Sequence, residues 1–554
     1  MSLLAEGSAV APVRRFVVTS VRGASLSPAL LLVCAGVPVL VAAWALLTTP
    51  VVLSKTMVQD LLFNLAGAWH VHSGHVAHVD FHDPAGRLSF ILTAIGFRLV
   101  GASPFAFLVN VVLVTAVLFA SSFVATVRRL PLLAAAIFVV FVSLLALVPV
   151  NVGERPDQYT FAMSYNRYGW SAYSILALIL FVPPRNGANR IWLDVGIAGL
   201  LLAMMFFLKI TYFAAGLATV GFAVLFHPHV SRHWRTWLAL SGLLAVNALA
   251  PYNHPYLGDV LGWAANGAVR RDLVLHLNNF LAALDQYAPY LVAIVVACWM
   301  WWSGRALRRL PLTLIFLFAA SLLLLSQNSQ VAGLPSGVVM LYVLYDQVRA
   351  HFAGVGNRDL APLLLALLVL PLFVVGSFAM SLAGYHASAG KNHGLYVVEQ
   401  TNLRGLAVPA HQAGTFVSLS HTFDYPMQTT AGPSTPLYRL SDYEYLVLLL
   451  QAADLMRVRP SGGVAVLDDV NPLPFMLGQP PVAGANLWSG WNAPLRPADE
   501  YLDGVRYVLV PKFPMTPQWT ADLKKHYGRY LDDHFQQAAE TRGWILLDRS
   551  PPRL

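Results

Sequence analysis

The sequence has 554 residues, of which 57% are hydrophobic and only 11% are charged, and its formal net charge is +9. A soluble protein carries roughly 25% charged residues, so this composition excludes an ordinary soluble domain and indicates a membrane protein. The two cysteines, Cys34 and Cys298, both lie in apolar runs, which excludes a disulfide framework and a thiolate metal site.

Long apolar runs recur from Leu30 to Met380, and a run of about 20 residues can cross a hydrocarbon core of ~30 Å. The first run is too long for a cleaved signal peptide, so we expect an uncleaved span there. The segment 89–122 is too long for one span and is expected to combine a short interfacial or re-entrant helix with a span. We expect about eleven transmembrane helices, near 28–50, 89–122, 131–150, 168–184, 191–208, 212–227, 236–252, 286–303, 311–327, 332–348 and 361–383.

The positive charge follows the expected topology. With the N-terminal segment 1–27 in the cytoplasm, the cytoplasmic segments hold the basic residues Arg14, Arg15, Arg22, Arg128, Arg129, Arg185, Arg190, Arg232, Arg235, Arg305, Arg308, Arg309, Arg349 and Arg358. The external loops hold half as many: Lys55, Arg87, Arg155, Arg167, Lys209, Arg270 and Arg271. This bias fits the positive-inside rule, so the charge indicates orientation in the membrane and no nucleic-acid partner.

The chain changes character after the transmembrane domain, which we place at 28–385. An odd number of spans puts residues 386–554 outside the cytoplasm. "GVAVLDD" (463–469), "VRYVLVPK" (505–512) and "GWILLDRS" (543–550) have the composition of strands. Ser441 and Glu444 form a capping-box pattern that begins a helix over 441–458, and 522–541 is a second expected helix. We therefore predict an extracytoplasmic α/β domain on an all-α polytopic membrane protein.

Ionisable residues gather in the external loops 51–88 and 151–168. Near a bilayer such residues are costly and mark a functional site by default. The first loop carries Asp60 and "HVDFH", with His78, Asp80 and His82; the second carries Glu154, Arg155, Asp157, Asn166 and Arg167; and Lys209 interrupts the later apolar segment "FFLKITYF".

The arrangement of these motifs resembles the GT-C-type integral-membrane glycosyltransferases, in particular the protein O-mannosyltransferases and lipid A aminoarabinose transferases. An acid, Asp60, follows the first span, and Gly74, His78, Asp80, Phe81 and Pro84 precede a hydrophobic segment that begins with Leu. "FRLVGASPFAFLVN" and a span that ends in Arg128 and Arg129 follow, and "FFLKITYF" is similar to the lysine at the external end of a family span.

The resemblance implies a hexosyl or pentosyl transferase in a bacterial inner (plasma) membrane, with an extracytoplasmic active site. It would move a sugar, with inversion, from a polyprenyl-phosphate donor to a hydroxyl of a lipid, glycan or protein acceptor. Such a reaction needs a carboxylate base, for which Asp60 is the candidate and Asp80 the second. It also needs cations for the departing phosphate, for which Lys209, Arg155 and Arg167 are candidates. Asp60 could instead only cap a helix, and Lys209 could only extend to the interface.

The histidines leave three interpretations open. In an extended strand His78, Asp80 and His82 would point to one side, where they could bind a divalent metal ion. They could also bind the phosphate or sugar hydroxyls, or be structural. No cofactor is required by the expected reaction.

Two other functions are open. A transporter or flippase of lipid-linked sugars would share the span count, but transporters usually show inverted repeats and ionisable groups near the midplane. An O-antigen-type polymerase or ligase is the other alternative.

Overall fold

The computed structural model describes residues 27–185, 190–266, 273–304, 308–326, 333–351, 357–391, 393–410, 440–490 and 493–549. The segment 1–27, expected in the cytoplasm, lies outside the described residues except for Ser27.

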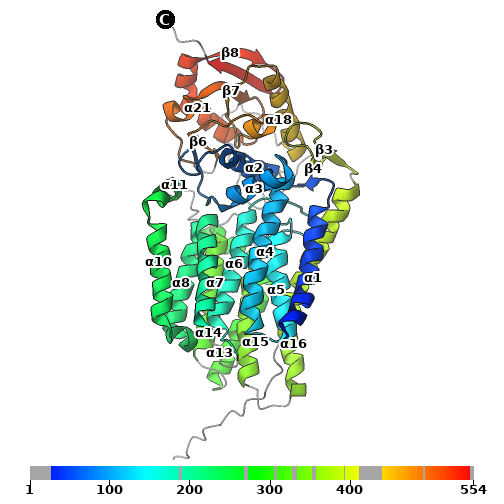
Figure 1. The fold of residues 1–554 in the computed structure, drawn as a ribbon, viewed down its shortest axis with the longest axis vertical. Coiled ribbons are helices and arrows are strands. Elements are labelled where there is room, and N and C mark those ends of the chain that lie inside the picture. The colour runs from blue at the N-terminus through cyan, green and yellow to red at the C-terminus, as the bar shows by residue number, and fades with distance from the viewer. Residues whose placement is uncertain are drawn as a thin grey trace, which may run out of the picture.

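A bundle of long helices running side by side forms the lower part of the molecule (Figure 1). Its helices are α1 (Pro28–Leu47), α4 (Phe105–Val127), α5 (Leu132–Leu147), α6 (Ser164–Phe181), α7 (Ile191–Leu208), α8 (Ile210–Phe226), α10 (Trp234–Ala248), α13 (Leu284–Trp302), α14 (Arg309–Ser326), α15 (Gly337–His351) and α16 (Asn357–Lys391). Five of the described helices are long and apolar enough to cross a membrane: α1, α4, α7, α14 and the part of α16 from Leu364 to Lys391.

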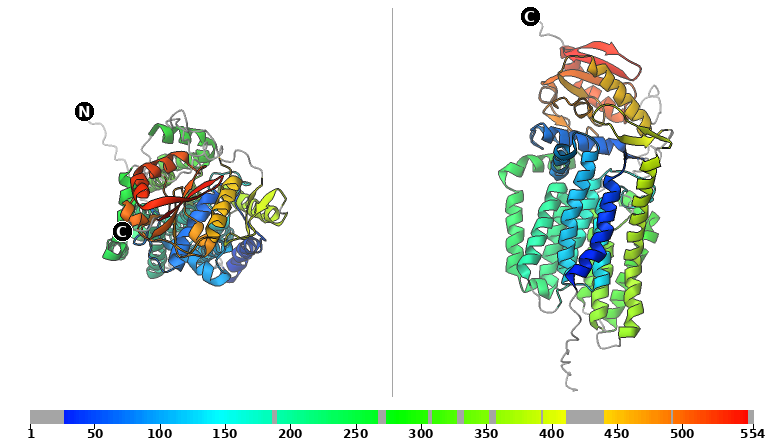
Figure 2. Two further views of the ribbon diagram at one scale, coloured as in Figure 1. Left: turned by 90° about the horizontal axis from the view of Figure 1, so that it is seen from above. Right: turned by 45° about the vertical axis from the view of Figure 1, so that its right-hand side comes forward.

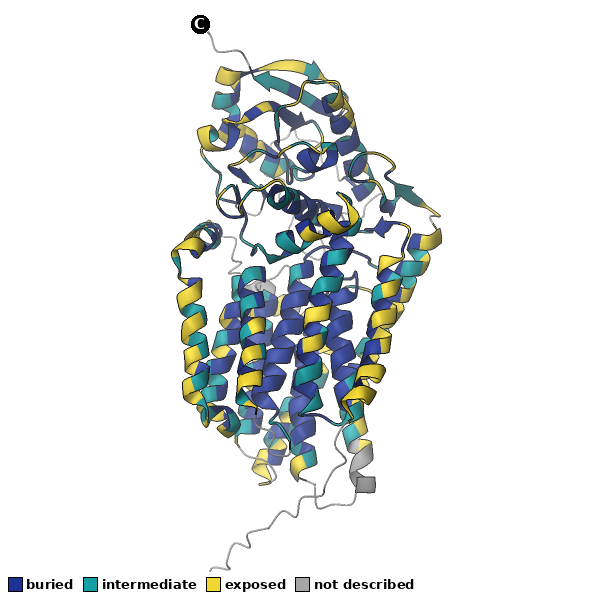
Figure 3. Ribbon diagram, in the orientation of Figure 1, coloured by how far each residue is buried: buried dark blue, intermediate teal, exposed yellow. Residues whose placement is uncertain are grey.

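Figure 3 shows why the bundle suits a membrane. Apolar side chains on the outer faces of α1 and α10 are exposed, for example Leu40 and Val246 at 70% each. The inner helices α5 and α6 are almost entirely buried. Exposed apolar side chains on the outer helices are stable against lipid and costly in water.

The segment 89–122 forms two helices, as predicted. Helix α3 (Leu88–Val100) ends at Gly101, which has a φ of +84°, a conformation that glycine adopts readily because it lacks a Cβ. Helix α4 begins directly after Pro104. Helices α2 (Val58–His72), α3 and α11 (His254–Ala265) lie at the upper end of the bundle, beneath the C-terminal part of the chain (Figure 1).

The C-terminal domain is built on a four-stranded sheet with the order β5-β7-β9-β8. Strands β5 (Gly463–Val466) and β7 (Val505–Pro511) are parallel, whereas β7 pairs with β9 (Trp544–Arg549), and β9 with β8 (Phe535–Glu540), in antiparallel fashion. β5, β7 and β9 lie where the sequence predicts strands. Helix α18 (Asp442–Arg457) begins with the predicted capping box, in which Ser441 and Glu444 satisfy each other's backbone N–H groups.

The predicted helix over 522–541 is wrong at its C-terminal end. Helix α21 (Pro517–His534) stops at His534, and "FQQAAE" forms β8 as an edge strand. These residues are good helix formers. Pairing with β9 through the tight connection Thr541–Gly543 overrides that preference, because a strand's stability comes mainly from its partner.

Short strands fasten the bundle to the domain. β1 (Val52–Leu53), just after α1, pairs in parallel with β4 (Leu406–Pro409), which pairs with β3 (Leu395–Val397). In the first loop, β2 (Phe81–His82) pairs in parallel with β6 (Ala485–Asn486). The two side views of Figures 1 and 2 agree that α2 lies between bundle and domain. The remaining elements are α9 (Pro228–Ser231), η1 (Pro251–Asn253), α12 (Leu273–Ala282), α19 (Leu473–Leu477) and α20 (Ala498–Leu502).

Candidate active site

Asp60 lies in the first turn of α2, at the upper end of the bundle. The residue that caps this helix is Met57, in the left-handed conformation, and Asp60 does not cap it. The Asp60 carboxylate instead accepts a hydrogen bond from the backbone N–H of Met163, at 3.3 Å. Burial raises the pKa of Asp60 to about 7, with the Met163 hydrogen bond opposing that rise. A carboxylate with such a pKa suits a general base near neutral pH.

A second acid, Asp83, lies in the first loop, which a close backbone contact holds against the end of α7. Gly86 donates its N–H to the carbonyl of Leu208, at the end of α7. A Cβ on Gly86 would lie 2.1 Å from the carbonyl oxygen of Phe207, so only glycine fits there. Asp83 is 2% exposed, and burial raises its pKa well above the ordinary value, opposed by the hydrogen bond from Ala85. Burial therefore favours the protonated form of the Asp83 carboxyl, which can donate a hydrogen bond.

Lys209 occupies the break between α7 and α8, with extended backbone. Its Nζ lies 5.4 Å from the centre of the Tyr165 ring. Burial lowers the pKa of Lys209 to about 8, and the charge of Asp83 opposes that change. The charges of Asp60 and Asp83 also act on Tyr165. Asp60, Asp83, Tyr165 and Lys209 are thus linked by these interactions, and we call the four residues the Asp60 site.

Next to it, Asp259 of α11 joins the first loop to the C-terminal domain. Its two carboxylate oxygens accept from Nδ1 of His78 at 3.0 Å and Nδ1 of His82 at 2.9 Å. A guanidinium nitrogen of Arg496 lies 2.9 Å from the same carboxylate. Burial alone would raise the pKa of Asp259, but the two histidines outweigh it and hold that pKa below the ordinary value. We call His78, His82, Asp259 and Arg496 the Asp259 hub.

The extended strand expected over 78–82 does not form. β2 contains only Phe81 and His82, residues 78–80 form a turn, and His78 has a φ of +69°. The Asp80 carboxylate accepts a hydrogen bond from the N–H of Val76 at 2.6 Å and so closes this turn. The acid that His78 and His82 share is Asp259. Among the described residues, no group of three or more His, Cys, Asp and Glu side chains is arranged to hold a metal ion.

The charged residues of the second loop lie apart from the Asp60 site. Arg155 and Asp157 form an ion pair at 3.5 Å, with side chains 73% and 61% exposed. Their charges act on Lys55, at the edge of the first loop. Glu154 is partly buried in the same loop, and its N–H donates to the carbonyl of Asn151. Binding of the donor phosphate by Arg155 stays a prediction.

Asn166 and Arg167 are fully buried near the start of α6. Arg167 donates to the carbonyl of Val150 at 3.2 Å. Its Nε and Nη2 are buried without a hydrogen-bond partner among the described residues. Binding of the donor phosphate by Arg167 stays a prediction.

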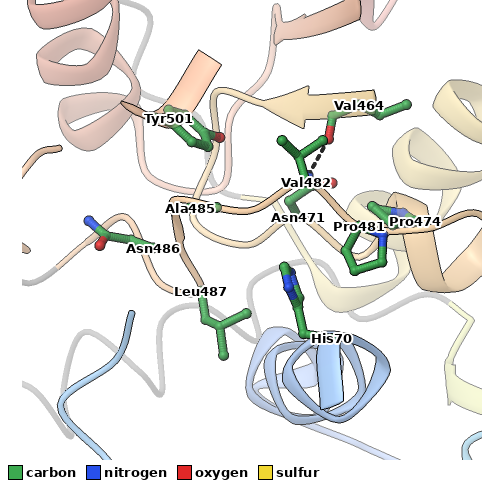
Figure 4. A pocket seen from close by; sticks show the side chains of 10 residues that line it. All are labelled: His70, Val464, Asn471, Pro474, Pro481, Val482, Ala485, Asn486, Leu487 and Tyr501. Carbon is green, nitrogen blue, oxygen red and sulfur yellow. Dashed lines mark hydrogen bonds between the residues drawn. The ribbon is translucent and has the colours of Figure 1, made fainter. Parts of the chain in front are cut away.

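Above α2, a small cavity separates this helix from the loops of the C-terminal domain (Figure 4). His70 forms its floor, and Asn471, Leu487 and Tyr501 are among its walls. Its volume of about 10 Å³ holds at most one water molecule. Burial, helped by His75, lowers the pKa of His70 to about 3, so His70 is a neutral packing residue.

Sequence reasoning missed Asp83, Tyr165, Asp259 and Arg496 as site residues. Asp83 follows His82 directly and stands in an Asp-Pro pair, a turn signal that would have placed it beside the histidines. Asp259 stands in the polar external segment "PYNHPYLGD" (251–259) and was grouped with the other external charges, but no role was given to it. Arg496 lies far along the chain and carries no motif, so only the fold reveals it.

No family model matches the sequence, and no curated protein matches it significantly. Two solved structures are similar in fold. The crystal structure of ArnT from Cupriavidus metallidurans bound to undecaprenyl phosphate has 12% identity and a TM-score of 0.44, with 95% of this chain and 99% of that chain covered. The apo structure of the same ArnT has 12% identity and a TM-score of 0.38, with 94% and 98% covered. Because the identity and the TM-scores are low, the proposed function rests on the side chains of the site.

Proposed function

We propose that this chain is an inverting glycosyltransferase of the bacterial inner membrane, which uses a polyprenyl-phosphate-linked sugar at its extracytoplasmic face. The observation that carries the proposal is the Asp60 site at one end of an apolar bundle. It holds a base with a pKa of about 7, a buried acid whose pKa is raised, and a lysine. A lipid donor can reach this end from the bilayer, and an acceptor can reach it from the C-terminal domain.

The reaction assigns each side chain one task. Asp60 takes the proton of the acceptor hydroxyl as its oxygen attacks the anomeric carbon, and the bond from that carbon to the phosphate oxygen breaks. Lys209 stabilises the negative charge that grows on the departing polyprenyl phosphate, and Asp83, whose raised pKa favours its protonated form, donates a hydrogen bond to it. The Asp259 hub holds the first loop, and therefore Asp83, in place. We propose that no metal ion takes part, so exhaustive chelation is expected to leave transfer unchanged.

A transporter or flippase is less well supported, because the residues of the Asp60 site lie at one end of the bundle and transporter sites lie near the midplane. The direct test uses the full-length protein in lipid nanodiscs with radiolabelled undecaprenyl-phosphate glucose, mannose, galactose and arabinose. We expect Asp60-dependent loss of sugar from at least one donor. Lipid translocation in liposomes without turnover of any donor would favour the flippase instead.

A further inference from the structure

A second group of polar side chains lies buried between α2 and the C-terminal domain, close to Asp60. Three acids belong to it: Asp442 at the start of α18, and Asp468 and Asp469 directly after β5. Each is 5% exposed or less. The charge of Asp60 contributes to raising the pKa of both Asp442 and Asp469, after burial. We call these acids, with Tyr445 and Gln59, the seam cluster.

The fold brings these residues together for a definite reason. β5 and β7 are parallel, so the loops after them leave the same edge of the sheet. The loop after β7 supplies Met515 and Thr516, whose N–H and hydroxyl bond Asp468 and Asp469 at 3.1 Å each. Asp442 accepts a hydrogen bond from the N–H of Val58, the first residue of α2. The carboxyl edge of the sheet therefore faces the helix that carries Asp60.

Several atoms of the seam cluster lack a hydrogen bond. Asp442 Oδ2, Asp469 Oδ1, Gln59 Oε1 and the Tyr445 hydroxyl are buried, and none has a hydrogen-bond partner among the described residues. The Tyr445 side chain is 1% exposed, and Asp442, Asp468 and Asp469 all lie close enough to act on its hydroxyl. The Tyr445 hydroxyl bonds none of these three carboxyls, and we call this set of unpaired donors and acceptors the gap. A buried polar group without a partner is costly, so the gap suits a polar ligand.

The chemistry of the gap favours a sugar. Its carboxyls accept hydrogen bonds, whereas the Tyr445 hydroxyl and the unpartnered indole N–H of Trp488 donate them. Trp488 packs edge-on against Phe63, with ring centres 5.7 Å apart, one turn of α2 beyond Asp60. Sugar hydroxyls both donate and accept, and sugar faces pack on aromatic rings. A plain alcohol has too few hydroxyls to satisfy these atoms, and a metal ion would leave both donors unpaired.

We propose that the seam cluster binds the acceptor, and that this acceptor is a sugar whose free hydroxyl reaches Asp60. The inference rests on the proposed function and adds the acceptor class to it. Asp469 and Tyr445 hold hydroxyls that do not react, while Asp60 takes the proton of the one that does. Lipid-linked and free glycans share this chemistry, and the site recognises the sugar in either.

The test measures transfer from the same labelled donors by the full-length protein in nanodiscs. Methyl α-glucoside, methyl α-galactoside and methyl α-mannoside are offered as acceptors, beside n-propanol and a threonine-containing hexapeptide. Release of sugar to water is followed separately, because it needs Asp60 but no acceptor subsite. We expect at least one glycoside to take label at least tenfold faster than propanol or the peptide. Equal or preferential labelling of propanol or the peptide would overturn the inference.

Two substitutions then locate the site. Tyr445→Phe removes one hydroxyl that has no hydrogen-bond partner among the described residues, and Asp469→Asn replaces one carboxyl with an amide. Each is expected to raise KM for the glycoside about tenfold, with donor affinity unchanged. Release to water should stay unchanged in Tyr445→Phe, the variant whose residue does not interact with the charge of Asp60. Tyr507→Phe removes another buried, unpartnered hydroxyl, at the opposite end of β7, and should change nothing. Because Tyr445→Phe breaks no described hydrogen bond, its unfolding temperature should stay within a degree or two of the parent's.

The outcomes separate the two proposals. If sugar is released to water in an Asp60-dependent manner but no glycoside is labelled, the sugar-acceptor inference fails and the proposed function stands. Unchanged KM in both folded variants also contradicts the inference. If no donor is turned over at all, the proposed function fails and the inference falls with it.

Discussion

Burial is the largest cause of the pKa shifts of Asp60 and Lys209, near the upper end of the bundle. Asp60 has its pKa raised to about 7, whereas Lys209 has its pKa lowered to about 8. The two groups titrate within about one unit of each other, so the site can hold a carboxylate base and a cation together only over a narrow range of pH.

The first prediction concerns that pH range. Asp60 must lose its proton to act, so turnover should rise with pH up to about 7. Lys209 must keep its proton to hold the phosphate, so turnover should fall as pH rises beyond about 8. We expect a bell-shaped profile of kcat/KM with its maximum between these values. Lys209→Arg, which cannot deprotonate, should move the alkaline limb upward and leave the acid limb unchanged. A flat profile from pH 6 to 9 would contradict both assignments.

The second prediction concerns Lys209 as a phosphate ligand. Lys209→Met keeps the apolar stem and removes the charge, so affinity for the donor should fall at least tenfold, because a charge-assisted hydrogen bond is lost. Lys55→Met is the matched control. Lys55 also lies over a tyrosine ring, with Nζ 4.5 Å from the centre of Tyr159, but away from Asp60. Equal donor affinity of parent and Lys209→Met, measured in folded protein, would mean that Lys209 only extends to the interface.

The candidate site could be predicted in part. Asp60 and Lys209 stood out because each interrupts an apolar context, where a charge is expensive without a purpose. His78 and His82 were correctly paired but given the wrong partner: the acid that they share is Asp259, and Asp80 closes its own turn. The alternation of residues over 78–82 predicted a strand, but the backbone forms a turn there. The turn needs a positive φ at His78, which cannot be predicted from a histidine at that position.

Helix ends and loops determine how rigidly the site is held. At the lower end of the bundle the basic pair at the end of α4, expected to set the orientation, also holds α7. Arg129 is fully buried and donates to Asp194 at 2.8 Å, and Arg128 reaches the same carboxylate at 3.2 Å. α7 ends at the break that carries Lys209, so this clamp fixes the far end of a helix that positions the site.

The third prediction concerns this clamp. Asp194→Ala leaves the buried Arg129 without its carboxylate, and breaking such a pair costs roughly 3–5 kcal/mol. The variant should unfold at a clearly lower temperature in detergent. Asp285→Ala removes an exposed acid from the first turn of α13 and should have little effect. Similar unfolding temperatures for Asp194→Ala and the parent would show that water or lipid replaces the lost carboxylate.

The whole molecule places the start of α1 and the C-terminal domain at opposite ends of the bundle (Figure 1). The sequence predicted most of the long helices and the sheet strands, because apolar runs and β-branched runs are strong local signals. It did not predict the parallel pairs β1–β4 and β2–β6, which join residues hundreds of positions apart. Nor did it predict β8, whose partner alone makes it a strand.

The fourth prediction concerns orientation. The excess of basic residues at one end of the bundle predicts that this end is cytoplasmic. A reporter that is active only outside the cytoplasm should give signal when fused after Leu554 and none when fused after Arg129. Signal from the Arg129 fusion alone would put the Asp60 site on the cytoplasmic face and exclude the proposed donor route.

The measurement that tests the account most directly is transfer by Asp60→Asn in nanodiscs. Asparagine keeps the shape of the side chain and can still accept the hydrogen bond from Met163, but it cannot take a proton. We predict that this variant inserts, folds and binds the donor like the parent, yet loses at least 10²-fold in turnover, as loss of a general base requires. Asp80→Asn, in the turn outside the site, should keep most of its activity. Near-normal turnover in Asp60→Asn would contradict the assignment of Asp60 as the base.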